Sequence, residues 1–216
     1  MSDSSKAFNR RDFLQASTLL PGFSLAVFLG EDAGDHPSAK NPEAGTPVSL
    51  PPGEDRRFEG EPHMRLMDLA CDFLVAGGGP SGVCAALAAA RNGAKVVLVQ
   101  DRSRLGGNSS SEVKMHIVGA NTHRGRPGWR EGGIIEELRL DDAANNPQRS
   151  WELWDLLLYD KITREPNITL LLDTALYAAE MSEGRIARVM ARCDKTETLY
   201  RIAATYFADC TGDGRL

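Results

Sequence analysis

The apolar residues of this chain fall into short runs from residue 71 onward, and their spacing predicts secondary structure. The run 71–76 is typical of a buried strand. The alanine-rich stretch 80–92 predicts a helix that Gly93 closes, and 95–100 predicts a second strand. Together these segments predict a β-α-β unit whose two strands run parallel and are joined by a right-handed crossover.

Two more helices are expected after a polar passage that is rich in glycine and arginine. They are predicted over 133–145 and 149–164, and prolines at 147 and 166 punctuate their ends. In the second helix, Trp151, Trp154 and Leu158 recur at helical spacing. This period predicts a face that packs in the core rather than a platform for a substrate.

Short apolar runs in the last quarter of the chain predict strands. They lie at 168–172, 175–181, 185–193, 198–203 and 205–209. Glu183 and Gly184 form a good tight turn between two of these runs. We therefore expect an antiparallel meander that leads into the last strand. No helix follows that strand, which leaves one sheet face poorly covered, so we expect the fold to be incomplete at its C-terminal end.

The first 30 residues resemble a bacterial twin-arginine export signal. Arg10 and Arg11 stand in an RRxFL core, and a moderately apolar stretch over 16–30 follows it. The resemblance implies recognition by the twin-arginine export machinery and a periplasmic or other extracytoplasmic location. No clear cleavage site follows, so an uncleaved membrane anchor stays open. The alternative is an ordinary polar tail with a chance arginine pair.

Residues 31–67 are rich in proline, glycine and acidic side chains and show no apolar period. This composition predicts an extended linker, with one folded domain over 68–216.

Composition excludes several classes of protein. The 216 residues carry a net charge of −5, which argues against a nucleic-acid binder. Hydrophobic residues make up 42% of the chain, an ordinary proportion for a globular protein. The four cysteines lie far apart without a CxxC pair, so they are expected to be core residues and no metal site is predicted.

The strongest chemical signal is a GxGxxG pattern between the first predicted strand and helix. Gly77 permits the tight turn, Gly79 lets a pyrophosphate approach the backbone, and Gly82 lets the helix pack on the strand. Pro80 and Ser81 open the helix, whose N–H groups and partial positive charge face the phosphates. The pattern predicts dinucleotide binding on a Rossmann-like α/β fold; the alternative is a glycine-rich packing turn.

The partner of the adenosine ribose normally lies at the end of the second strand. Gln100 holds that place here, and Asp101 comes next. An amide binds hydroxyl groups without the charge-assisted strength of a carboxylate, so either residue is a candidate.

Two further motifs resemble the FAD-dependent oxidoreductase family of two-dinucleotide-binding-domain flavoproteins. The sequence LGGNSSSE occupies 105–112, and FADCTGDG occupies 207–214. The resemblance covers about 68–216 and implies FAD as the cofactor and a small molecule as the substrate. By this resemblance, the further cofactor-binding candidates are Gly106, Gly107, Asn108, Ser109, Thr211, Gly212 and Asp213, although 211–214 could alternatively be a simple turn. Arg102 could add positive charge near the phosphates, and surface solvation is the alternative for it.

Catalytic residues are much less evident, because a flavin carries out hydride chemistry itself. Glu112, His116 and His123 follow the second glycine loop and are weak candidates, and a structural or surface role is the alternative for both histidines. Two other functions stay open. One is an NAD(P)-binding dehydrogenase, which the bare GxGxxG pattern allows. The other is a truncated remnant without catalysis.

Overall fold

The computed structural model describes residues 57–58, 60–118 and 132–216. The expected export signal and His123 lie outside the described residues. Within the described ranges, no helix is long and apolar enough to cross a membrane.

The described part of the chain forms one sheet of seven strands. The strands are β1 (Arg57–Phe58), β2 (Glu61–Ala76), β3 (Val96–Val99), β4 (Ile168–Leu171), β5 (Ala175–Ser182), β6 (Arg185–Cys193) and β7 (Thr198–Asp209). Their order is β4-β3-β2-β7-β6-β5, and β1 pairs with β2. Strands β4, β3, β2 and β7 run parallel, whereas β7, β6 and β5 form an antiparallel meander. The expected Rossmann-like α/β fold with a meander is therefore confirmed.

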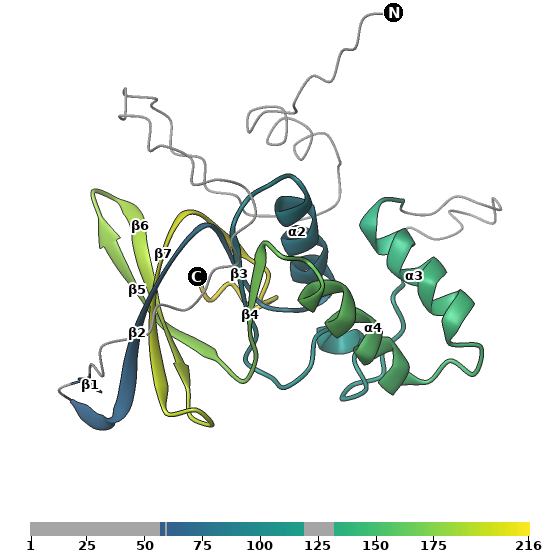
Figure 1. Cartoon of the computed structure of the whole chain (residues 1–216), viewed down its shortest axis with the longest axis horizontal. Coiled ribbons are helices and arrows are strands. Elements are labelled where there is room, and N and C mark those ends of the chain that lie inside the picture. The colour runs from purple at the N-terminus through teal and green to yellow at the C-terminus, as the bar shows by residue number, and fades with distance from the viewer. Residues whose placement is uncertain (1–56, 59, 119–131) are drawn as a thin grey trace, which may run out of the picture.

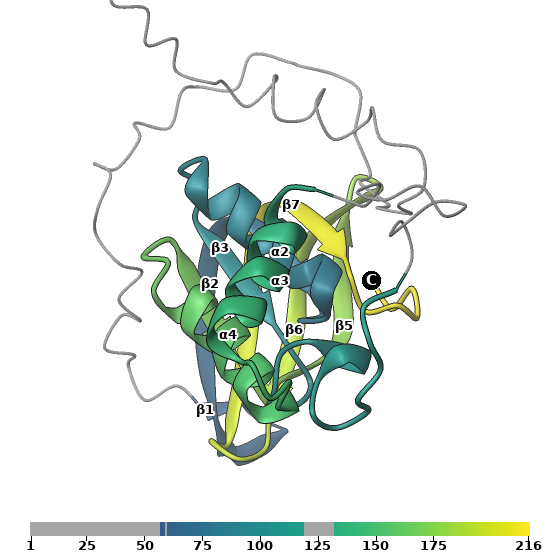
Figure 2. The same cartoon turned by 90° about the vertical axis from the view of Figure 1, so that its right-hand side faces the viewer.

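Three helices lie on one side of the parallel strands, as Figures 1 and 2 show. They are α2 (Pro80–Arg91), α3 (Ile134–Asn145) and α4 (Trp151–Thr163). Helix α2 packs on β2 and β3, and α3 packs against α2 and α4. These positions agree with the predicted helices to within two residues at each end.

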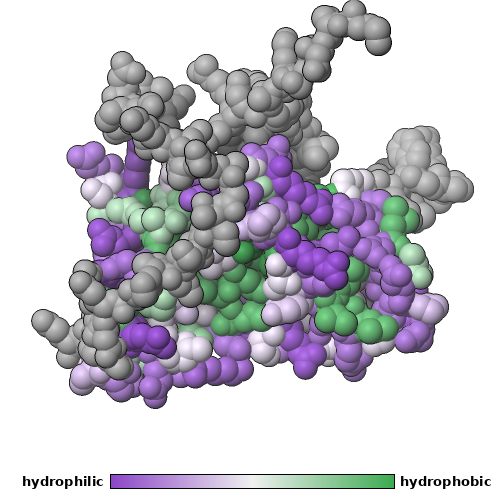
Figure 3. Space-filling model, in the orientation of Figure 1, coloured by the Kyte–Doolittle hydropathy of each residue, from purple (hydrophilic) through white to green (hydrophobic). Residues whose placement is uncertain are grey.

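Alternate residues of the parallel strands face two separate cores. Val75 and Leu98 pack with the helices, while Leu74 and Val97 pack with Ile202 and other residues of the meander. The face away from the helices was expected to be poorly covered, but Leu74 and Val97 on it are buried, in a cluster with residues of β6 and β7 and without a second layer of helices. Figure 3 shows the surface on this side of the molecule, where apolar residues gather in the middle of the view and again toward its right, among hydrophilic residues.

Two predicted boundaries need correction. Strand β2 begins at Glu61, inside the segment 31–67 that was expected to be a linker. Its first half mixes polar residues with Met64, Leu66 and Met67 in no regular alternation, although Met64 is buried. Strand β7 is continuous from Thr198, where the sequence predicted two strands, because it pairs with β2 along nearly its whole length.

The predicted turn between β5 and β6 is confirmed. Glu183 and Gly184 both have positive φ values, 51° and 75°, as a tight hairpin turn of the primed type requires.

Candidate cofactor-binding site

Three loops meet at the carboxyl ends of the parallel strands. Residue Ala76 at the end of β2 pairs with Val99 of β3 on one side and with Asp209 of β7 on the other. The loops that follow these strands are 77–79, 101–112 and 210–216. Ligands of open α/β sheets bind outside the carboxyl ends of the strands, so this edge is the candidate site.

The first glycine loop is shaped by contacts that exclude side chains. Gly77 has a φ of +98°, and a Cβ there would lie 2.5 Å from the carbonyl oxygen of Cys210. A Cβ at Gly82 would lie only 1.8 Å from the carbonyl oxygen of Gly77. By contrast, a Cβ at Gly79 would meet no atom within 4 Å. Gly77 and Gly82 are thus required by the fold, and Gly79 leaves an open space.

That open space lies at the N-terminus of α2. Gly79 is the N-cap without any side-chain cap, Pro80 is the first helical residue, and the first turn holds no acidic residue. Ser81 is exposed on the same turn. The N-terminal N–H groups of a helix carry about half a positive charge, so this end suits an anion.

The second glycine loop lies directly against the first. The N–H of Gly106 donates to the carbonyl oxygen of Gly78 at 2.8 Å. A Cβ at Gly107 would lie 3.2 Å from the Cα of Gly79. Both Gly106 and Gly107 have positive φ values, 101° and 52°. The two loops therefore present one continuous backbone surface around Gly79.

Asn108 and Ser109 in this loop differ in exposure. Asn108 is exposed, whereas Ser109 is buried. The Ser109 hydroxyl donates to the carbonyl oxygen of Gly106 at 2.7 Å and accepts from the Trp154 indole N–H at 3.4 Å. Ser109 thus shapes the loop, and Asn108 is free to face a ligand.

Gln100 is buried beneath both glycine loops. Its Oε1 accepts from the N–H of Gly78 at 2.7 Å, and its Nε2 donates to the carbonyl oxygen of Arg104 at 3.0 Å. The amide therefore bridges the two loops instead of projecting from them. Asp101, the other candidate for the ribose, is exposed.

The third loop is organised by Asp209 at the end of β7. Its Oδ1 accepts from the N–H and the hydroxyl of Thr211 at 2.9 and 2.6 Å, and its Oδ2 accepts from the N–H of Leu216 at 2.9 Å. Burial works against ionisation, but these hydrogen bonds outweigh it and hold the pKa of Asp209 below its ordinary value. Gly212 and Asp213 are exposed on this turn. Asp209 is not among the predicted cofactor-binding residues, although an aspartate that bonds the backbone N–H two residues on is typical of turns.

The family model for FAD dependent oxidoreductases matches residues 72–216. The chain belongs to this family. Its cofactor is FAD, and its Rossmann-like fold is an FAD-binding fold. The match begins within β2 and includes all three loops.

The FAD-dependent oxidoreductase chain is also similar to several characterised proteins. It is 31% identical to the digoxin reductase of Eggerthella lenta over 110 residues, which cover 49% of this chain and 18% of that protein. It is 31% identical to the sarcosine oxidase subunit alpha of a Corynebacterium species over 101 residues, which cover 47% of this chain and 9% of that protein. The chain therefore spans less than a fifth of the length of these relatives.

Two solved structures are similar in fold. The FrdA chain of E. coli quinol fumarate reductase has 15% identity and a TM-score of 0.47, and the match covers 65% of this chain and 32% of that chain. The FAD-dependent myxobacterial chondrochloren halogenase has 17% identity and a TM-score of 0.45, covering 68% and 38%.

The catalytic candidates do not form a cluster in the described part of this flavoprotein. Glu112 pairs with Arg102, with Oε2 and Nη1 3.3 Å apart. The His116 ring packs on Trp151 at a centroid distance of 5.1 Å. Arg102, a candidate for contact with phosphate, is exposed, and this ion pair compensates part of its charge.

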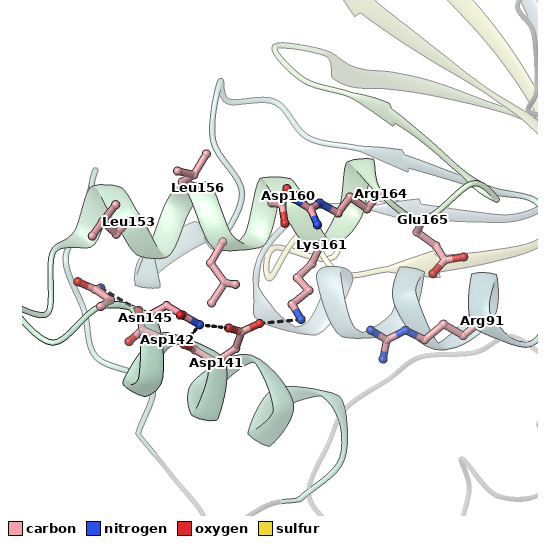
Figure 4. A pocket seen from close by; sticks show the side chains of 12 residues that line it. Arg91, Asp141, Asp142, Asn145, Leu153, Leu156, Asp160, Lys161, Arg164 and Glu165 are labelled. Atoms are coloured by element: carbon pink, nitrogen blue, oxygen red, sulfur yellow. Dashed lines mark hydrogen bonds and ion pairs between the residues drawn. The ribbon is translucent and has the colours of Figure 1, made fainter.

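A cavity of about 640 Å³ opens elsewhere on the molecule, between α3, α4 and the C-terminal end of α2. Figure 4 shows Lys161 of α4 pointing toward Asp141 of α3, and their Nζ and Oδ2 atoms are 2.7 Å apart. Arg91, at the opposite end of α2 from Gly79, also lines it. Two ion pairs join residues of this lining, Lys161 with Asp141 and Arg164 with Asp160. The lining includes no residue of the glycine loops.

Proposed function

We propose that the two glycine loops hold the pyrophosphate of FAD. One observation carries this proposal: the space over Gly79 is free of side chains, and it lies between Gly107 and the N-terminus of α2. A pyrophosphate needs close backbone approach and N–H donors, and this surface offers both. The residues present therefore fit the group.

The remaining contacts follow from which candidates are exposed. Asp101 is the residue of this chain that would bind the adenosine ribose, because the amide of Gln100 already joins the loops. Asn108 and Asp213 are exposed on the neighbouring loops at the same sheet edge and would contact the inner half of the cofactor, and the half-buried Thr211, which is bonded to Asp209, would shape the turn beside them.

We further propose that the chain binds FAD for an oxidoreductase reaction on a small molecule. FAD supplies hydride transfer to or from the substrate. The relatives include a reductase and an oxidase by name, and the matched region is a small share of each. What these residues do is to bind and orient the cofactor.

The test is a titration of the purified full chain with FAD, followed by flavin fluorescence, for two alanine variants. Gly79→Ala should fold normally, since its φ of −65° suits any residue. It should weaken FAD binding by roughly tenfold or more, about 1.4 kcal/mol, because its Cβ enters the pyrophosphate space. Gly132→Ala is the matched control, because a Cβ there also meets no atom within 4 Å.

Three outcomes would overturn this proposal. Tighter binding of NADH or NADPH than of FAD would favour a dehydrogenase. A folded chain that binds no dinucleotide would favour the remnant. Equal FAD affinity in both variants would remove Gly79 from the site.

Export in folded form is a separate proposal, supported by the RRxFL sequence alone. Replacing Arg10 and Arg11 together by lysine should retain the protein in the cytoplasm of a bacterial host that has the twin-arginine pathway. Cell fractionation measures this, with the unchanged chain in a pathway-deficient strain as the control. Export of the lysine variant at the normal level would contradict the proposal.

A further inference from the structure

Helix α4 contacts the second glycine loop along one face. The indole N–H of Trp154 donates to the Ser109 hydroxyl at 3.4 Å. A Cβ at Gly106 would lie 3.0 Å from Cδ1 of Leu158, which is fully buried. Because Gly106 and Gly107 have no side chains of their own, contacts from elsewhere must fix this loop.

Asp155 makes the polar part of this contact. It is only 8% exposed, on the same helix. Its Oδ1 accepts from the N–H of Ser111 at 3.0 Å, and its Oδ2 accepts from Nη1 of Arg104 at 3.1 Å. Arg104 also donates to the Ser111 hydroxyl at 2.7 Å. One carboxylate thus ties Arg104, two residues before Gly106, to Ser111, four residues after Gly107.

We infer that Asp155 is a positioning residue for FAD, which it serves by holding the loop 104–111 in place against Gly79. This inference rests on the proposed function of the glycine loops. Charge-assisted hydrogen bonds to a buried carboxylate are among the stronger contacts in proteins. If this loop is already ordered before FAD binds, it loses little conformational freedom on binding. The affinity of the protein for FAD is therefore higher.

The chain offers a matched pair of substitutions on one helix. Asp155→Asn keeps the size of the side chain but turns an amide group toward Arg104 or Ser111. Asp160→Asn makes the same change at an exposed carboxylate that pairs with Arg164 and lies away from the loop. Each variant is titrated with FAD, and its unfolding by urea is measured without FAD.

Asp155→Asn should raise the Kd for FAD by about tenfold or more, equivalent to about 1.4 kcal/mol, under conditions where the variant is fully folded. Asp160→Asn should leave the Kd unchanged. A purely structural role for Asp155 would move the urea midpoint and leave the Kd of the folded protein unaltered. That result would overturn the inference.

Arg104→Gln extends the test, because Arg104 is half exposed and its loss should be tolerated by the fold. If Arg104 acts on the loop through Asp155, the two substitutions should be non-additive in the Kd. Additive effects on the Kd would mean that Arg104 acts directly on the phosphates of FAD. They would overturn the inference that Arg104 acts through Asp155. If Asp155→Asn does not fold, an unchanged Kd in Arg104→Gln overturns the inference.

The same experiment separates the two proposals. An unchanged chain that binds no FAD would end the proposed function and this inference with it. An unchanged chain that binds FAD, with Asp155→Asn binding equally well, would end this inference alone.

Discussion

The N–H of Gly106 donates a hydrogen bond of 2.8 Å to the carbonyl oxygen of Gly78, and this bond joins two loops that follow different strands. Gln100 reinforces the same junction from below through its hydrogen bonds to Gly78 and Arg104. The glycine loops therefore form one structural unit. A change in either loop is expected to alter the surface that both present to the cofactor.

Gly82→Ala should damage the fold, in contrast to Gly79→Ala. The new Cβ would lie 1.8 Å from the carbonyl oxygen of Gly77, which is backbone and has little freedom to move away. Forced overpacking of this kind costs about 1–3 kcal/mol or more. Urea unfolding of the two variants beside the unchanged chain measures the difference. A Gly82→Ala chain with the normal midpoint would show that α2 does not pack on the loop as described.

The order of elements in this fold could be predicted because its helices and buried strands follow regular apolar periods. The alanine-rich α2 is an example. The turn at Glu183 and Gly184 could be predicted for another reason, because these residue types favour a tight turn. The first half of β2 escaped prediction because its pairing with β7 is long-range and its residues are mostly polar. The residues near β2 in the sequence do not indicate that its partner strand lies more than a hundred residues away.

The candidate site likewise could be predicted from the sequence only in part. The roles of Gly77 and Gly82 followed from their spacing, since backbone contacts at these positions are common to the pattern. The role of Gln100 did not, because the end of a strand fixes where a side chain starts and not which way its amide turns. Asp155 was missed because it follows Trp154 in what reads as an ordinary core helix.

Gln100→Glu should destabilise the junction of the two loops. A carboxylate can still accept from Gly78, but it offers no hydrogen to the carbonyl oxygen of Arg104. The carbonyl oxygen of Arg104 would then lack its donor, which should lower the free energy of unfolding by about 1–3 kcal/mol at neutral pH. The deficit should shrink as the pH falls, because a protonated carboxyl group can donate. Urea unfolding at two pH values measures this, with the exposed Gln148→Glu as control; equal losses in both variants would refute the bridging role.

The cysteines should react slowly with thiol reagents while the protein is folded. Burial raises the pKa of Cys71 to about 12 and that of Cys84 to about 11. Burial also raises the pKa of Cys210, although a hydrogen bond with Ser81 works in the opposite direction. These thiols stay protonated at neutral pH, and the thiolate is the reactive form. A colorimetric thiol assay should show slow reaction until guanidinium unfolds the chain; rapid reaction of Cys84 in the folded chain would contradict its burial.

Asp209 should make the third loop sensitive to acid. Burial raises its pKa, but hydrogen bonds from Thr211 and Leu216 lower it further, so the folded value lies below the unfolded one. Its contribution to stability is therefore present above the pKa of an unfolded aspartate, about 3.9, and is lost as the pH falls through the folded value. Asp209→Asn should lower the free energy of unfolding at neutral pH, and its difference from the unchanged chain should narrow in acid. Asp213→Asn, at an exposed carboxylate in the same turn, is the matched control. A constant difference across the acid range would mean that Asp209 does not organise the loop as a carboxylate.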